Sequence, residues 1–226
     1  MVLLERPQSL LLILSLLCAL PCSALDPTPQ PEGTPGSWDA LLARIERAFS
    51  EVKTIQSRFV QEKELAVFQD KVILKGRMVM ENPGRLAWRV EEPVRYAFLL
   101  SEKTLQQWDE ETGKVQKMSL SSNPAFEIVD SQLRGWFSGR YRELSKDYEV
   151  AVQGEAPCRL AFVPRPSSVI AKAVRSVTVE LREDLRYLRS IEIMDLNGDR
   201  TRYSFEETRL NEPIEPKDWE IVPREP

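Results

Sequence analysis

KVILKGRMVMENPGRLAWRV, residues 71–90, is the stretch that decides the fold of this chain. Apolar side chains recur at every second position on both sides of its centre, and most of the positions between them are charged. This period of two is typical of a β-strand that buries one face. Asn82-Pro83-Gly84, between the two runs, is a turn signal, because these residues favour tight reversals of the backbone. The stretch therefore predicts an antiparallel hairpin.

The same pattern continues through most of the chain. Glu92-Pro93 breaks the pattern before a strand predicted at 96–100, and Thr112-Gly113 closes another hairpin. Asn197-Gly198 is a strong signal for a two-residue hairpin turn. Further alternating segments lie at residues 177–181, 188–193 and 203–205, and residues 167–174 are expected to form a loop with a helical turn. Short strands separated by frequent turns predict an antiparallel meander with one apolar face.

Two segments carry apolar residues at helical spacing instead. In the first, Ser37 is expected to cap a helix with Asp39 in its first turn. The apolar stripe of that helix is Leu41, Leu42, Ile45, Ala48, Phe49, Val52 and Ile55. In the second, Asn123 is the expected cap, Pro124 the first helical residue and Gly139 the stop. Its stripe is Phe126, Val129, Leu133, Trp136 and Phe137.

These helices need an apolar surface to cover. A sheet closed on itself would not supply one, whereas an open sheet exposes its concave face. The expected fold is therefore mainly β with α: a single antiparallel, open (incomplete) β-barrel covered by a helical lid.

The N-terminal segment has the features of an export signal. Residues 1–24 combine an apolar run with the small residues Cys22-Ser23-Ala24, so we expect a signal peptide that is cleaved after Ala24. Lipid attachment at Cys22 is the disfavoured alternative, because Ala19-Leu20-Pro21 departs from the usual motif. Residues 25–36 are rich in proline and are expected to form a flexible leader. The domain is expected over residues 37–222.

The composition argues against several classes of function. The chain has no histidine and a net charge of −4, which disfavours Ser-His-Asp or Cys-His catalysis and a nucleic-acid partner. Cys158 is expected to be an ordinary strand residue, because a nucleophilic thiol needs a base. The acidic pattern at residues 195–206 is read as a hairpin and not as a calcium loop, since Arg200 replaces the required glycine. We expect no enzyme activity, no metal and no cofactor.

Several short motifs together resemble the LolA family of outer-membrane lipoprotein carrier proteins. The motifs that carry the resemblance are Phe59-Val60-Gln61, Gly76-Arg77-Met78, Pro83-Gly84-Arg85-Leu86-Ala87-Trp88-Arg89, Pro93, Leu105-Gln106-Gln107-Trp108-Asp109, Asp195-Leu196-Asn197-Gly198, Tyr203-Ser204-Phe205 and Asn211-Glu212-Pro213-Ile214. Their order and spacing extend over residues 37–222. The resemblance implies the open barrel and helical lid of LolA and LolB.

The resemblance also implies a function. Proteins of this kind are periplasmic chaperones for lipoprotein localisation, which bind lipoprotein acyl chains in an apolar cavity and transport them from the inner to the outer membrane. The implied partners are an inner-membrane lipoprotein-releasing transporter and an outer-membrane acceptor, and we expect a soluble monomer in the periplasm. Two alternatives stay open: a carrier of another envelope lipid or glycolipid, and a periplasmic module that senses lipoproteins.

The alternating pattern selects the expected lipid-binding cavity. Its candidate residues are Met78, Met80, Leu86, Trp88, Val90, Phe98, Leu100, Phe126, Leu133, Trp136 and Phe137. Methionine suits a loose apolar lining, and the aromatic side chains supply area. Alternation cannot tell a face covered by lipid from a face covered by protein. The resemblance departs at Asn82, where the best-known members carry an arginine that helps to hold the lid closed.

Overall fold

The computed structural model describes residues 35–67, 71–82, 84–122 and 124–222. The expected signal peptide, most of the leader and the expected cap Asn123 lie outside these ranges. The helices are α2 (Pro35–Ser50), α3 (Pro124–Phe137) and α4 (Tyr141–Leu144), with short 3-10 turns at Leu120–Ser122, Val169–Lys172 and Pro216–Trp219. The strands are β1 (Thr54–Glu64), β2 (Lys71–Glu81), β3 (Arg85–Glu92), β4 (Tyr96–Leu100), β5 (Thr104–Asp109), β6 (Val115–Ser119), β7 (Tyr148–Glu155), β8 (Cys158–Pro164), β9 (Val174–Leu181), β10 (Leu188–Asp195) and β11 (Arg200–Leu210).

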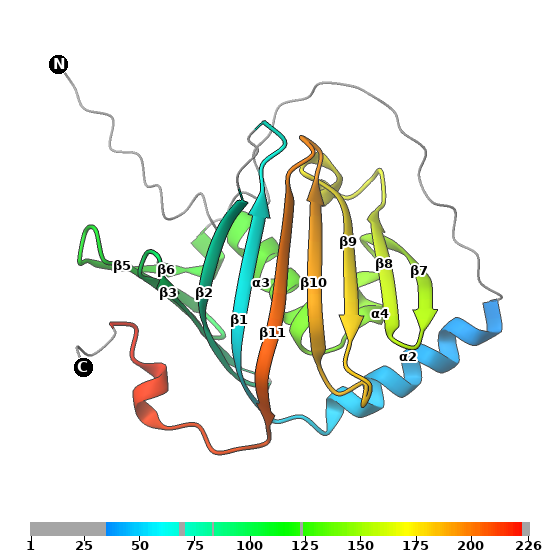
Figure 1. Cartoon of the computed structure of the whole chain (residues 1–226), viewed down its shortest axis with the longest axis horizontal. Coiled ribbons are helices and arrows are strands. Elements are labelled where there is room, and N and C mark those ends of the chain that lie inside the picture. Colours follow the sequence, from blue (N-terminus) through cyan, green and yellow to red (C-terminus); the bar gives the residue numbers. More distant parts are fainter. Residues whose placement is uncertain (1–34, 68–70, 83, 123, 223–226) are drawn as a thin grey trace.

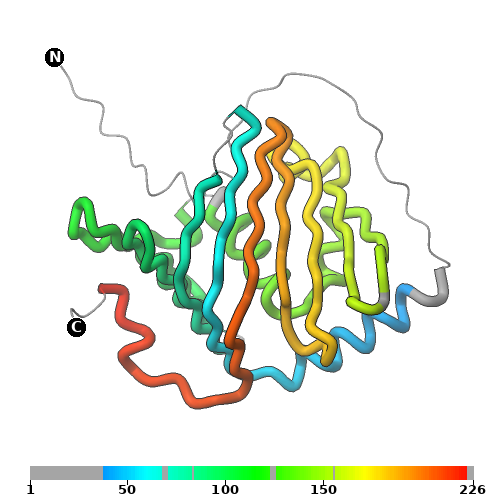
Figure 2. The backbone as a smooth tube through the Cα atoms, viewed as in Figure 1, coloured from blue at the N-terminus to red at the C-terminus, as the bar shows by residue number. Residues whose placement is uncertain are grey.

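The strands form one antiparallel sheet whose edges do not meet. Its order is β6-β5-β4-β3-β2-β1-β11-β10-β9-β8-β7, so the first and last strands pair at its centre. The two edge strands, β6 and β7, follow one another in sequence and are joined by the segment that carries α3 and α4. Figures 1 and 2 show the sheet curved around these helices, with α2 crossing one end of it. The predicted open barrel with a helical lid is confirmed.

The predicted elements agree with the observed ones in most places. The hairpins at 82–84, 112–113 and 197–198 are present, and the helical turn expected within 167–174 is Val169–Lys172. The first helix begins at Pro35, so the expected cap Ser37 lies inside it and Asp39 lies beyond its first turn. The helix is also shorter at its C-terminal end than predicted, because Val52 lies in the following turn and Ile55 belongs to β1. Both side chains are buried, as the stripe required, but they reach the core from a turn and a strand.

Gly76 allows β2 to approach the aromatic core. A Cβ at this position would lie 1.9 Å from the Arg89 carbonyl oxygen and 2.7 Å from the Phe59 ring. The Phe59 ring stacks on Trp88 with their centroids 4.0 Å apart. The glycine in the alternating run therefore marks a place where backbone and ring fill the space of a side chain.

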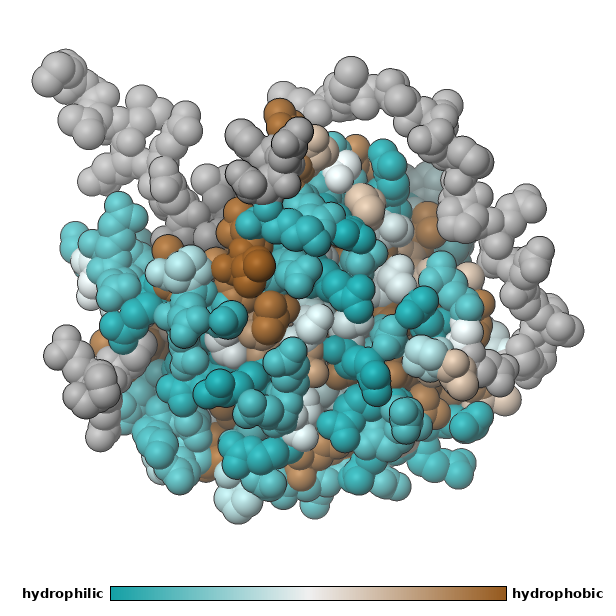
Figure 3. Space-filling view, viewed as in Figure 1, coloured by the Kyte–Doolittle hydropathy of each residue, from teal (hydrophilic) through white to brown (hydrophobic). Residues whose placement is uncertain are grey.

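The outer face of the sheet is only partly wet. Figure 3 shows this face as mostly hydrophilic, with an apolar patch near the start of β2. Val72, expected on the buried face, is 43% exposed at that end of the strand. Arg89, on the expected wet face, is only 4% exposed because the C-terminal segment covers it. Its guanidinium donates hydrogen bonds to the carbonyl oxygens of Asp218 (2.7 Å) and Glu220 (2.6 Å).

Candidate functional site

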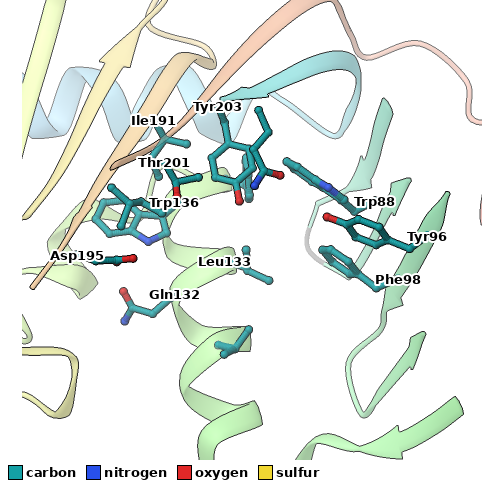
Figure 4. Close-up of a pocket in the computed structure, with 14 residues that line it drawn as sticks. Trp88, Tyr96, Phe98, Gln132, Leu133, Trp136, Ile191, Asp195, Thr201 and Tyr203 are labelled. Carbon is teal, nitrogen blue, oxygen red and sulfur yellow. The ribbon is translucent and has the colours of Figure 1, made fainter. Parts of the chain in front are cut away.

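A cavity of about 110 Å³ lies between the concave face of the sheet and α3. Figure 4 shows its walls, with α3 on one side and strands of both halves of the sheet on the other. Its apolar lining consists of Trp88, Phe98, Val129, Leu133, Trp136, Phe137, Ile191 and Ile193. Its polar lining consists of Gln61, Tyr96, Gln132, Asp195, Thr201 and Tyr203. The cavity is thus amphipathic, with apolar side chains in the majority.

Aromatic rings make up much of the apolar wall. Trp88 lies at their centre, within 6.1 Å of Phe98 and 5.5 Å of Tyr203, measured between ring centroids. On the lid side, Trp136 packs edge-on against Phe162 at 4.7 Å. Rings of this size bury a large apolar area with few rotatable bonds, so the wall is broad and comparatively rigid.

Polar groups enter the cavity at the end of β10 and on α3. Asp195 is 7% exposed, and its burial raises the pKa of its carboxyl to about 6, although the nearby charge of Lys63 acts in the opposite direction. The amide oxygen of Gln132 accepts a hydrogen bond of 2.8 Å from the hydroxyl of Tyr148. Burial also raises the pKa of Tyr96 to about 12, so its hydroxyl stays protonated and able to donate.

One arginine ties α3 to the rim of the sheet. Arg134 donates hydrogen bonds to the carbonyl oxygens of Gly84 in the β2–β3 turn (3.1 Å) and of Ser101 after β4 (3.0 Å). Asp130, one turn earlier on α3, holds the same guanidinium at 2.6 Å. A hollow of about 10 Å³ lies beside these contacts. Arg134 therefore joins the lid helix to two separate turns of the sheet.

The hydrogen bonds of Arg134 join the lid to the β2–β3 turn even though residue 82 is asparagine and not arginine. The side chain of Asn82 makes a long contact, 3.4 Å from its amide nitrogen to the carbonyl oxygen of Val52, and within the described residues no hydrogen bond joins it to α3. In this chain the arginine that links the β2–β3 turn to the helix is on α3, and a carbonyl oxygen of the turn accepts its hydrogen bond. Sequence reasoning missed Arg134, because it examined only the arginines near Asn82.

The eleven candidate residues fall into two groups. Those that line the cavity are Trp88, Phe98, Leu133, Trp136 and Phe137. Those placed elsewhere are Met78, Met80, Leu86, Val90, Leu100 and Phe126; the first five of these are buried in the core and Phe126 packs against it. Met80, Leu86 and Leu100 line the small hollow beside Arg134. Lipid binding by any of these residues remains a prediction.

The cavity also contains residues that were not candidates. Ile191, Ile193 and Asp195 alternate along β10, and Thr201 and Tyr203 alternate along β11. This alternation was available in the sequence, and it places Asp195 on the same face as two isoleucines. The acidic residues of this segment were considered only as calcium ligands and not as part of a cavity wall. In the structure this segment is a hairpin, as predicted, with a 2.9 Å hydrogen bond from the amide of Asp195 to the carbonyl of Asp199.

The cavity is too small in this conformation for an acyl chain. An apolar cavity of about 150 Å³ accepts one benzene molecule. Because an acyl chain has many more carbon atoms than benzene, a space of about 110 Å³ cannot enclose it. The structure is therefore a closed form, in which the side chains of α3 occupy much of the concavity.

The chain was compared with known proteins. The family model described as "Outer membrane lipoprotein carrier protein LolA" matches residues 50–221. An outer-membrane lipoprotein carrier protein of Coxiella burnetii (strain CbuK_Q154) is 21% identical over 189 residues, which cover 80% of this chain and 82% of that protein. Across the described ranges, no helix has both the length and the apolar character needed to cross a membrane.

Solved structures with a similar backbone are more distant. Lipoprotein LppX of Mycobacterium tuberculosis has a TM-score of 0.45 at 16% identity, with 78% of this chain and 98% of that chain covered. A chain of the MucA/MucB complex of Pseudomonas aeruginosa has a TM-score of 0.46 at 13% identity, with 81% and 60% covered. Assignment to a family rests on the sequence match, which covers most of the domain. The chain belongs to the LolA family of outer-membrane lipoprotein carrier proteins.

Proposed function

We propose that this chain is a periplasmic carrier that shields the acyl chains of lipoproteins from water and moves them from the inner to the outer membrane. The observation that carries the proposal is the amphipathic cavity under α3, whose aromatic wall is already formed and whose lid is held by apolar packing and by hydrogen bonds from Arg134. Membership of the LolA family supports the same function. A transporter that releases lipoproteins at the inner membrane and an acceptor at the outer membrane would be its partners.

The free energy of transfer sets what the cavity must supply. Each CH₂ group moved out of water contributes about 0.8 kcal/mol, so a chain of sixteen carbons corresponds to roughly 12 kcal/mol. The carrier must offer comparable apolar area and still release the chain at the acceptor. Broad rings such as Trp88 and Phe98 supply area without a shape that fits one ligand closely.

Loading requires α3 to move. The helix contributes Val129, Leu133, Trp136 and Phe137 to the apolar lining, so its displacement would open the concavity and offer these side chains to the ligand as a second wall. The sheet face opposite would stay in place, because its strands are hydrogen-bonded across the whole width. Binding would therefore exchange contacts between α3 and the sheet for contacts of both with the acyl chain.

Native mass spectrometry of the protein purified from its own host without detergent tests this proposal. A mass increment equal to an intact acylated lipoprotein is the expected result. An increment equal to a glycolipid or a free lipid would replace lipoproteins by another envelope lipid as cargo. Protein that carries no lipid and binds no added acyl probe would refute the carrier function.

A transfer assay separates a carrier from a sensing module. Loaded protein is mixed with acceptor vesicles that contain an outer-membrane extract, and the bound lipid is followed into the vesicles. A carrier gives up its cargo at a rate that rises with the amount of extract. A sensor retains the cargo at every amount of extract, and that result would contradict the proposed transport.

A further inference from the structure

The cavity contains a carboxyl group with an unused hydrogen-bond acceptor. Within the described part of the chain, Oδ1 of Asp195 is fully buried and has no hydrogen-bond partner. The other buried side-chain atoms without partners in that part belong to Arg89, Gln107 and Arg186, which do not line the cavity. A buried polar atom normally has a partner, because leaving it unpaired costs free energy. An orphan acceptor that faces a cavity is therefore placed to receive a donor from a ligand.

Other polar side chains share the cavity with this carboxyl. Figure 4 shows Asp195 directed into the cavity, in the part where Gln132 and Thr201 also lie. Tyr203 lies beyond Trp136 from Asp195, and Tyr96 lies across the cavity, beside Trp88 and Phe98. Asp195 comes from β10, Gln132 from α3 and Thr201 from β11, so three elements contribute polar groups to the cavity.

The part of the cavity around Asp195, its polar end, differs from the neighbouring hairpin. The neighbouring Asp199 is also buried, but its Oδ1 accepts a hydrogen bond of 2.9 Å from the amide of Ala66 and so serves the hairpin. Asp195 makes no comparable side-chain contact at Oδ1, and it sits among Trp136, Ile193 and other apolar groups. The unpaired Oδ1 costs free energy in the closed form, which favours a role in binding over a role in folding.

We infer that the cavity binds amphiphiles whose polar part carries hydrogen-bond donors, an ammonium or a hydroxyl group, with that part seated against Asp195. This inference rests on the proposed function, since it assumes that the acyl part of the ligand lies along the aromatic wall. A positively charged amine is the best match, because it both donates to the carboxyl and compensates its charge. An amphiphile with a carboxylate head is the worst match, because two like charges would meet in an apolar site.

The test compares three probes that have the same chain and different heads. Decylamine, decanol and decanoate are titrated at pH 7.5 into the protein loaded with the neutral fluorescent probe N-phenyl-1-naphthylamine, and displacement gives the three affinities. We expect decylamine to bind at least about tenfold more tightly than decanoate, the size of effect that one charge-assisted hydrogen bond gives. Decanol should lie between them.

Two variants assign the preference to Asp195. In Asp195→Asn the ratio of the decylamine and decanoate affinities should fall to within about threefold of unity, and Asp195→Ser is the second replacement if Asn prevents folding. The control is Glu192→Gln on the same strand, whose side chain pairs with Arg200 and Arg202 and does not line the cavity. Its ratio should equal that of the wild type.

The outcomes separate this inference from the proposed function. If the three probes bind with equal affinity to the wild type, the cavity takes acyl chains and water satisfies Asp195, so the polar end is refuted while the carrier function stands. If the preference survives in both Asp195 variants, another group selects the head and the inference is wrong. If no probe displaces the fluorophore, the proposed function itself fails.

Discussion

Arg134→Ala should release α3 from the sheet without unfolding it. The substitution removes the hydrogen bonds to the carbonyl oxygens of Gly84 and Ser101, while the ion pair with Asp130 lies within the helix and does not hold it to the sheet. The guanidinium is about one-fifth exposed, so each bond is given a value at the low end for charged donors, about 1–1.5 kcal/mol. The two bonds together contribute about 2–3 kcal/mol, which corresponds to a roughly 30- to 150-fold change in the equilibrium between open and closed lid.

Amide hydrogen exchange is the measurement that checks this value. The amides of α3 should exchange roughly 30- to 150-fold faster in Arg134→Ala, whereas those of the central strands β1 and β11 should keep their wild-type rates. Arg140→Ala is the matched control, because among the described residues the Arg140 side chain has polar contacts with Ser138 and Glu143 of its own segment and with no strand. Its exchange should be unchanged.

Two results would refute the reasoning. Unchanged exchange in α3 would mean that apolar packing alone holds the lid and that the two hydrogen bonds are replaced by water at no cost. Faster exchange in every strand would mean that Arg134 stabilises the whole fold. A lid contact predicts a change that is confined to α3.

Three further predictions follow from the site and its support. Gly76→Ala should destabilise the fold by more than about 3 kcal/mol in urea unfolding, because its Cβ would overlap the Arg89 carbonyl. Gly113→Ala is the control and should cost only about 1–2 kcal/mol, because the space around Gly113 is open. Similar losses in the two variants would show that β2 can shift. Leu133→Asp should weaken binding of an acyl probe at least about tenfold, because it puts an unpaired carboxylate into the cavity wall formed by α3. Ser131→Asp is the control: Ser131 is exposed on the same helix, so this change should leave the affinity unaltered. Equal affinities of the two variants would show that α3 is not part of the binding site. The pKa of Asp195 is raised from 3.8 to about 6, so the stability that its protonated form gives is complete below pH 3.8 and is lost as the pH rises through 6. Relative to Asp195→Asn, the wild type should lose unfolding free energy over this range, and parallel pH profiles would contradict the assignment.

The sequence predicted the fold well, because the signals that determine it are local. Alternation along 71–90 and the turn at 82–84 require only neighbouring residues, and both elements formed as expected. The second helix, with Pro124 first and Phe137 last, was found from its stripe and its caps. The order of the strands, with β1 beside β11, depends on contacts between distant residues and was not predicted.

The candidate site was predicted less completely. Alternation correctly identified a buried face, but it could not tell the part that packs on the protein's own core from the part that faces a cavity. Met78 illustrates this limit, since its sulfur accepts a hydrogen bond of 3.4 Å from the hydroxyl of Tyr187 deep in the core. The polar lining was missed because a search for apolar residues excludes Gln132 and Asp195 from the start.

The pairing of β1 with β11 has a consequence for the synthesis of the protein. One wall of the cavity comes from β3 and β4, early in the chain, and the other from β10 and β11, near its end. The two walls are brought together only when residues 200–210 pair with 54–64. A chain in which residues 200–210 have not yet paired with 54–64 therefore lacks the complete cavity. Pairing of strands so far apart in sequence is also slow, so the final step of folding and the first moment of competence to bind should coincide.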